Sequence, residues 1–129
     1  LAKEKGAAVI SIKTMNSGAW PQGAERARKW WYRPLEKQDE INLAYRWTLS
    51  LPGVVAGIPV SFLDLQEKAI AAGLAHRPAT ETDAKKLEQM AQDCGSIFKR
   101  EEDLVAFHSP YPHSPHECCM GEWRGEAPA

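Results

Sequence analysis

The sequence has 129 residues, enough for one domain with a modest core. Its 16 Lys and Arg nearly balance its 17 Asp and Glu, and a formal net charge of −1 gives no electrostatic reason to expect nucleic acid or an anionic membrane as a partner. No window approaches the roughly 18 consecutive apolar residues of a membrane span. The three cysteines include an adjacent pair and make no obvious disulfide framework, which predicts a reducing, cytoplasmic compartment.

The first residues read as the end of a helix. Residues 1–5 are a charged run, and Gly6 follows in the position where a left-handed glycine commonly closes a helix. Because a domain rarely opens on the last turn of a helix, we expect the sequence to be part of a longer protein.

The first half of the chain predicts one strand and one good helix. Residues 7–15 (AAVISIKTM) are apolar and β-branched, which indicates a strand buried on both faces. Residues 25–31 are weakly helical. Residues 36–51 predict a stronger helix that Pro52-Gly53 ends. Its apolar side chains share one face: Ile41, Ala44, Tyr45, Thr48 and Leu51.

A second strand and two helices follow. Residues 54–60 (VVAGIPV) predict another buried strand. Two sequences are then typical of capping boxes: Ser61 with Asp64 opens a helix that ends at Gly73, and Thr80 with Asp83 opens a longer one. The apolar stripe of the longer helix is Ala84, Leu87, Met90, Ala91, Cys94, Ile97 and Phe98, so Cys94 is expected to be a core residue.

The order strand, helix, strand, helix, helix, tail predicts an α/β fold with a parallel sheet. Two strands leave unpaired edges, and a complete barrel of alternating strands and helices needs roughly 250 residues. From about residue 107 the chain is rich in Pro, His, Ser, Gly and Glu and reads as an irregular tail.

Two segments resemble the aldo-keto reductase family. Residues 4–15 (EKGAAVISIKTM) and 44–59 (AYRWTLSLPGVVAGIP) are similar to its sixth and seventh barrel strands with the intervening helix, and residues 62–72 are similar to its next helix, which faces the cofactor. The resemblance implies that residues 1–106 are the C-terminal part of a TIM-type (β/α)8 barrel, namely its last βα units and C-terminal helix, and that residues 107–129 lie outside it.

In this family the strand ends hold NADP or NAD. By position, the resemblance implies cofactor-binding roles for Ile12, Lys13, Met15, Ser17 and Gly18 near the nicotinamide and pyrophosphate, and for Ile58, Pro59, Ser61, Gln66 and Glu67 on the adenosine side. A helix start at Ser61 would offer N–H groups and a favourable dipole to a phosphate, and Gly18 would permit close backbone approach. The family's usual basic residue after the seventh strand is absent here, as is its adenine-binding Asn.

The resemblance also implies which chemistry the chain lacks. The family's catalytic Tyr, Lys, Asp and His come from earlier strands, and none of Tyr32, Tyr45 or Tyr111 lies at a matching strand end. We therefore expect the cofactor-side part of an oxidoreductase that reduces a small carbonyl compound, inactive without the remainder of the barrel. The alternative is a non-catalytic, barrel-derived binding or scaffold piece.

Two other groups of residues carry possible functions. A cluster in the tail could bind zinc, although its spacing is irregular and a flexible tail is the favoured interpretation; it comprises His108, His113, His116, Cys118 and Cys119. Trp30-Trp31-Tyr32, beside basic residues, could stack on a nucleic acid or a sugar, but we favour packing over the end of the barrel.

Overall fold

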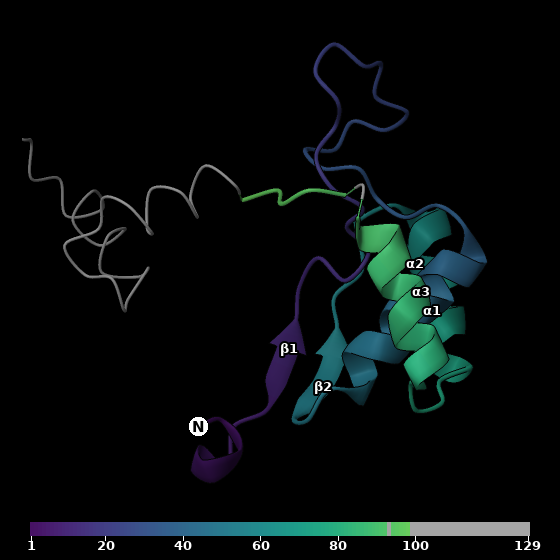
Figure 1. Ribbon diagram of the computed structural model, residues 1–129. Coiled ribbons are helices and arrows are strands. Elements are labelled where there is room, and N and C mark those ends of the chain that lie inside the picture. Colours follow the sequence, from purple (N-terminus) through teal and green to yellow (C-terminus); the bar gives the residue numbers. More distant parts are fainter. Residues whose placement is uncertain (93, 99–129) are drawn as a thin grey trace, which may run out of the picture. The chain divides into compact units, whose positions relative to one another are not determined.

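The computed structural model describes residues 1–92 and 94–98. It is a mixed α/β fold with a two-stranded parallel sheet and three α-helices (Figure 1). The elements are a short 3-10 helix at Lys3–Lys5, then β1 (Val9–Ser11), α1 (Gln38–Ser50), β2 (Val54–Gly57), α2 (Leu63–Leu74) and α3 (Glu81–Ala91). These elements belong to one unit, Leu1–Gly95, whereas residues 96–98 belong to a second. Within the described ranges, no helix has the length and apolar character needed to cross a membrane.

The two strands confirm the predicted parallel sheet. Cα partners are Val9 with Val54, Ile10 with Ala56 and Ser11 with Gly57, and the register shifts between the first two pairs. The chain passes from β1 to β2 through α1, and both arrows in Figure 1 point the same way. The segments that follow the strands therefore start at one edge of the sheet.

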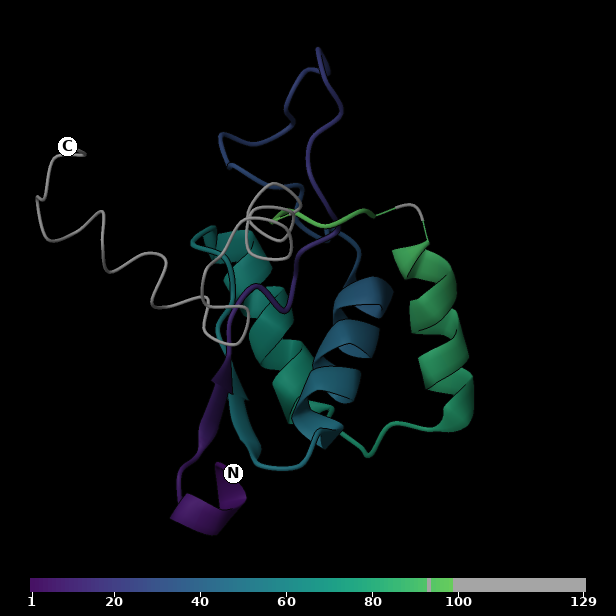
Figure 2. The ribbon, with the colours of Figure 1, turned by 60° about the vertical axis from the view of Figure 1, so that its left-hand side comes forward.

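The predicted burial of the strands on both faces is wrong. Ile10 is 58% exposed and Val55 is 64% exposed. Both strands are also shorter than predicted. Of the three helices, α1 makes the main contact with the sheet, against β2, and the helices lie on one side of it (Figure 2). Much of the apolar surface of the sheet is consequently left uncovered by the described elements.

Helix α1 forms the centre of the core, because it packs against β2, α2 and α3. Its predicted inner face is confirmed at Ile41, Ala44 and Tyr45, which are all buried, but is wrong at Leu51, which lies just past the helix end and is 42% exposed. Gly57 lets the Tyr45 ring approach: a Cβ there would lie 3.0 Å from Tyr45 Cε1. The Tyr45 hydroxyl donates to the Gly57 carbonyl at 3.4 Å, so side chain and strand are joined at the same point.

Two of the predicted helix boundaries are correct. Gly6 adopts the left-handed conformation, with φ 66°, and its N–H donates to Lys3 O. Thr80 and Asp83 form the full capping box at the start of α3.

The other boundaries differ. Helix α2 begins at Leu63, so its N-cap is Phe62 and not the predicted Ser61, and no side chain caps it; the Asp64 carboxylate is bonded to Arg28. It also continues through Gly73 to Leu74, whereas α3 ends at Ala91, well before residue 98. Residues 25–31 are not helical.

Candidate functional site

The carboxyl edge of the sheet brings together the two segments predicted to bind a cofactor. The Ile58 N–H donates to the Ser11 carbonyl at 2.8 Å, so the chain after β2 starts beside the chain after β1. Ile12 and Ile58 are exposed at this edge, and Ser61 is exposed just before α2. Pro59 and Gln66 are half-buried and Glu67 is exposed.

Lys13 occupies an unusual backbone position at this edge. Its φ is 60°, in the left-handed region that side chains other than Asn, Asp and Gly rarely adopt. Its carbonyl accepts from Asn16 N at 2.9 Å, which turns the chain immediately after the strand. The Lys13 ammonium lies 5.3 Å from the ring centroid of Trp31, a side chain that is 49% exposed. A cation and an accessible indole therefore lie together at the strand end.

Gly18 and Met15 are both buried by protein. Gly18 has φ 98°, and a Cβ added to it would lie 1.8 Å from the carbonyl oxygen of Cys94. The close backbone approach expected for a pyrophosphate is thus made by the segment after α3. Met15 is completely buried in the core.

Ser17 is engaged at the base of a long loop. Residues 15–18 and 33–35 run antiparallel, with hydrogen bonds of 2.8–2.9 Å that join Ser17 N to Arg33 O, Arg33 N to Gly18 O and Leu35 N to Met15 O. The Arg33 guanidinium adds bonds from Nη2 to Ser17 O at 2.8 Å and from Nε to Ser17 Oγ at 3.1 Å. Residues 19–32 project from this base as the dark-blue loop in Figure 1.

Aromatic residues pack between this loop and the start of α2. Trp30 meets Tyr32 and Phe62 edge-on, with ring centroids 5.9 and 5.6 Å away. The Arg28 guanidinium lies 4.9 Å from the Phe62 centroid. Trp31 also meets Tyr32 edge-on, with ring centroids 4.9 Å apart, so all three residues of the Trp30-Trp31-Tyr32 run pack against other side chains, although Trp31 is 49% exposed.

Arg28 also bridges two carboxylates. Its Nε and Nη2 donate to Glu36 at 2.6 and 2.8 Å, and its Nη1 and Nη2 donate to Asp64 at 3.1 and 2.5 Å. These hydrogen bonds raise the pKa of Arg28 and lower the pKa of both Glu36 and Asp64. The bridge ties the loop to α2.

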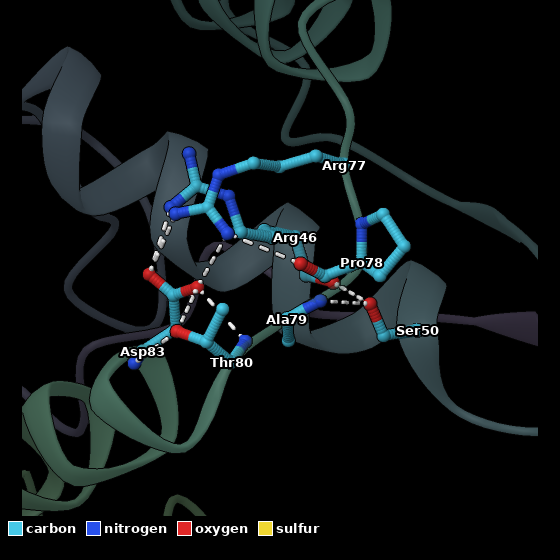
Figure 3. Close-up of polar contacts among 7 residues, drawn as sticks. All are labelled: Arg46, Ser50, Arg77, Pro78, Ala79, Thr80 and Asp83. Atoms are coloured by element: carbon cyan, nitrogen blue, oxygen red, sulfur yellow. Dashed lines mark hydrogen bonds and ion pairs between the residues drawn. The ribbon is translucent and has the colours of Figure 1, made fainter.

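A second charged cluster joins α1 to α3 (Figure 3). The buried Asp83 carboxylate accepts from Arg46 Nη1 and from Arg77 Nη1, each at 2.9 Å. The Thr80 N–H donates to Asp83 at 3.0 Å, and this bond, followed by those from the arginines and the Thr80 hydroxyl, holds the pKa of Asp83 far below its usual range. Ser50 Oγ accepts from Ala79 N at 2.8 Å. These bonds fix the segment before α3 against α1, although the buried Nε of Arg46 has no hydrogen-bond partner among the described residues, and we assign the cluster a structural role.

Sequence reasoning missed two hollows beside α3. One, of about 440 Å³, lies between α1 and α3, with Asp39, Arg46 and Lys86 on its walls. The other, of about 400 Å³, lies between the base of the loop and the end of α3, where Arg33 and Cys94 meet it. Neither has a local sequence signature, because each is made by segments far apart in the chain.

Cys94 is half-buried, is not one of the buried core residues as predicted, and lies beyond the end of α3 at Ala91; its Sγ donates to Met90 O at 3.1 Å. Across residues 1–92 and 94–98, no three His, Cys, Asp or Glu side chains are grouped to hold a metal ion. The His and Cys cluster of the tail, His108 to Cys119, lies outside the described residues, as does the predicted boundary after residue 106.

Comparison of the chain with protein-family models, with curated proteins and with solved structures gave no match.

Proposed function

We propose that this chain is the cofactor-side part of a nicotinamide-dependent, aldo-keto-reductase-like oxidoreductase that acts on carbonyl compounds. In this proposal its strands and helices are the last βα units of a TIM-type barrel, and the catalytic residues lie outside the chain. The observation that carries the proposal is the parallel pairing of β1 with β2 through α1. It starts the segments after both strands at one carboxyl edge, which is where barrel enzymes bind their ligands.

The residues at this edge fit a dinucleotide in part. Lys13 offers a cation, and the start of α2 after the exposed Ser61 offers the positive end of the helix dipole to a pyrophosphate. Ile12 and Ile58 offer exposed apolar surface to a nicotinamide ring, which supplies a hydride when bound. Pro59, Gln66 and Glu67 remain candidates for the adenosine side. Met15 and Gly18 are no longer candidates, because Met15 is buried in the core and the Cys94 backbone covers Gly18.

The proposal is tested by titrating the full chain with NADPH while tryptophan fluorescence is recorded. A dinucleotide at Lys13 quenches the half-exposed Trp31, so we expect a saturable decrease. Lys13→Asn removes the charge with a residue that tolerates φ 60°, and should weaken binding about tenfold, the value of one hydrogen bond to a charged group. Lys85→Asn, on the exposed side of α3, is the matched control.

Two results would reject the proposal: no saturation at millimolar NADPH, or equal affinities for the two variants.

The uncovered sheet favours a second candidate function, a non-catalytic binding or scaffold piece. Exposed apolar side chains of Ile10 and Val55 could pack against a partner, such as the remainder of a barrel. A scaffold binds no dinucleotide, so the same titration separates the two candidates.

A further inference from the structure

The 400 Å³ groove beside the loop has a mainly apolar wall. Trp20, Pro34, Leu35, Met90 and Cys94 supply most of it. Its volume lies within the range of small-molecule sites, roughly 300–1,000 Å³. Of the residues proposed above for a dinucleotide, Ser17 alone is on its wall, so the groove is a separate place in the fold.

The charges on the groove wall balance, with Arg33 and Lys37 against Glu36 and Glu40, but of these four only Arg33 lacks an oppositely charged partner in the described part of the chain. Lys37 and Glu40, both on the wall, neutralise each other at 2.9 Å, and Glu36 is held by Arg28. Arg33 differs, because its guanidinium donates only to the neutral oxygens of Ser17. Within the part of the chain that the structure describes, no carboxylate lies within ion-pair distance of Arg33.

A half-buried guanidinium without a counter-ion favours an anionic ligand. Arg33 uses Nε and Nη2 on Ser17 but makes no hydrogen bond through Nη1 to any described residue. Guanidinium groups pair well with carboxylates, and the pairing strengthens next to apolar surface, where water competes less.

We propose that this groove binds a small monocarboxylate with an aromatic or other apolar body. The carboxylate pairs with Arg33, and the body lies against Trp20, Leu35 and Met90. The proposal goes beyond the dinucleotide function and does not depend on it, since it uses a different set of side chains.

Calorimetric titration of the full chain with 3-phenylpropionate tests this proposal. We expect saturable binding, and about tenfold weaker binding both of neutral 3-phenylpropanol, which cannot pair with Arg33, and of acetate, which lacks the apolar body. No saturation below about 10 mM 3-phenylpropionate, or equal affinity for the acid and the alcohol, would overturn the proposal. Equal affinity for acetate would also overturn it, by showing an anion site without an apolar component.

Variants assign the binding to the groove. Arg33→Met should abolish the preference for the acid over the alcohol, whereas Lys29→Met, which removes a charge from an exposed position in the same loop, should leave that preference unchanged. Ala27→Trp fills the groove from an exposed loop position and should weaken both ligands by tenfold or more, even if Arg33→Met fails to fold. Unchanged binding by the Ala27→Trp variant would place the ligand elsewhere and reject the groove.

Discussion

Replacing Gly18 with alanine tests how the end of α3 is held against the loop. The new Cβ would lie 1.8 Å from the Cys94 carbonyl oxygen and 2.7 Å from its carbon, and because both are backbone atoms they cannot rotate away. The positive φ of 98° adds about 1–2 kcal/mol for a residue with a side chain, and forced overpacking adds about 1–3 kcal/mol. We therefore expect a loss of about 2–5 kcal/mol in the free energy of unfolding, measured by urea denaturation with circular dichroism.

Two other glycines separate these costs. Gly23 also has a positive φ, but a Cβ there would meet nothing within 4 Å, so Gly23→Ala reports the backbone cost alone. Gly73 lies inside α2 with open space around it, and Gly73→Ala should increase stability by up to about 1 kcal/mol. If Gly18→Ala costs no more than Gly23→Ala, the close contact between Gly18 and Cys94 is refuted.

Three further changes probe the helix cap and the buried ionisable groups. Thr80→Ala removes the capping box and should cost about 1 kcal/mol in urea unfolding, whereas Thr82→Ala, at an exposed position two residues later, should cost much less. Because the folded pKa of Asp83 is depressed, its stabilising effect is complete above the unfolded pKa of about 4 and is lost as the pH falls below it. The melting temperature should decline in acid, and Asp83→Asn should be less stable than the native chain at pH 7 and show a flatter acid profile. Burial raises the pKa of Tyr45 to about 12, so the folded chain binds more protons than the unfolded chain above about pH 10, and stability should decrease there. Ultraviolet titration should show a late-ionising tyrosine that Tyr45→Phe removes; its persistence in that variant would contradict the assignment.

The features that could be predicted from sequence depend on neighbours along the chain. The inner face of α1 follows from helical spacing, and the Thr80–Asp83 cap from a four-residue pattern. The capping box expected at Ser61 does not form, because α2 starts one residue later, with Phe62 as its N-cap; the Asp64 carboxylate instead binds Arg28, 36 residues earlier, a partner that no local pattern predicts. The same reasoning applies to Gly18, whose neighbour Cys94 is far along the sequence.

The burial of the sheet and the position of the groove could not be predicted either, because both depend on how distant segments pack together. The apolar runs of β1 and β2 indicate side chains suited to burial, but not which element covers them, and Ile10 and Val55 are exposed in the described structure. The groove depends on the antiparallel pairing of residues 15–18 with 33–35, and no turn motif in the sequence predicts this pairing. Arg33 is accordingly recognisable as a ligand-binding candidate only once its partners are known.

Amide NMR spectra of the full chain, recorded with increasing NADPH, would test the cofactor role of the strand edge most directly. We predict saturable shifts for the amides of residues 12–13, 58 and 60–63, which belong to the carboxyl edge of the sheet and the start of α2, with small changes in α3. Shifts confined to α3, or none at millimolar NADPH, would contradict the proposal that this edge binds a dinucleotide.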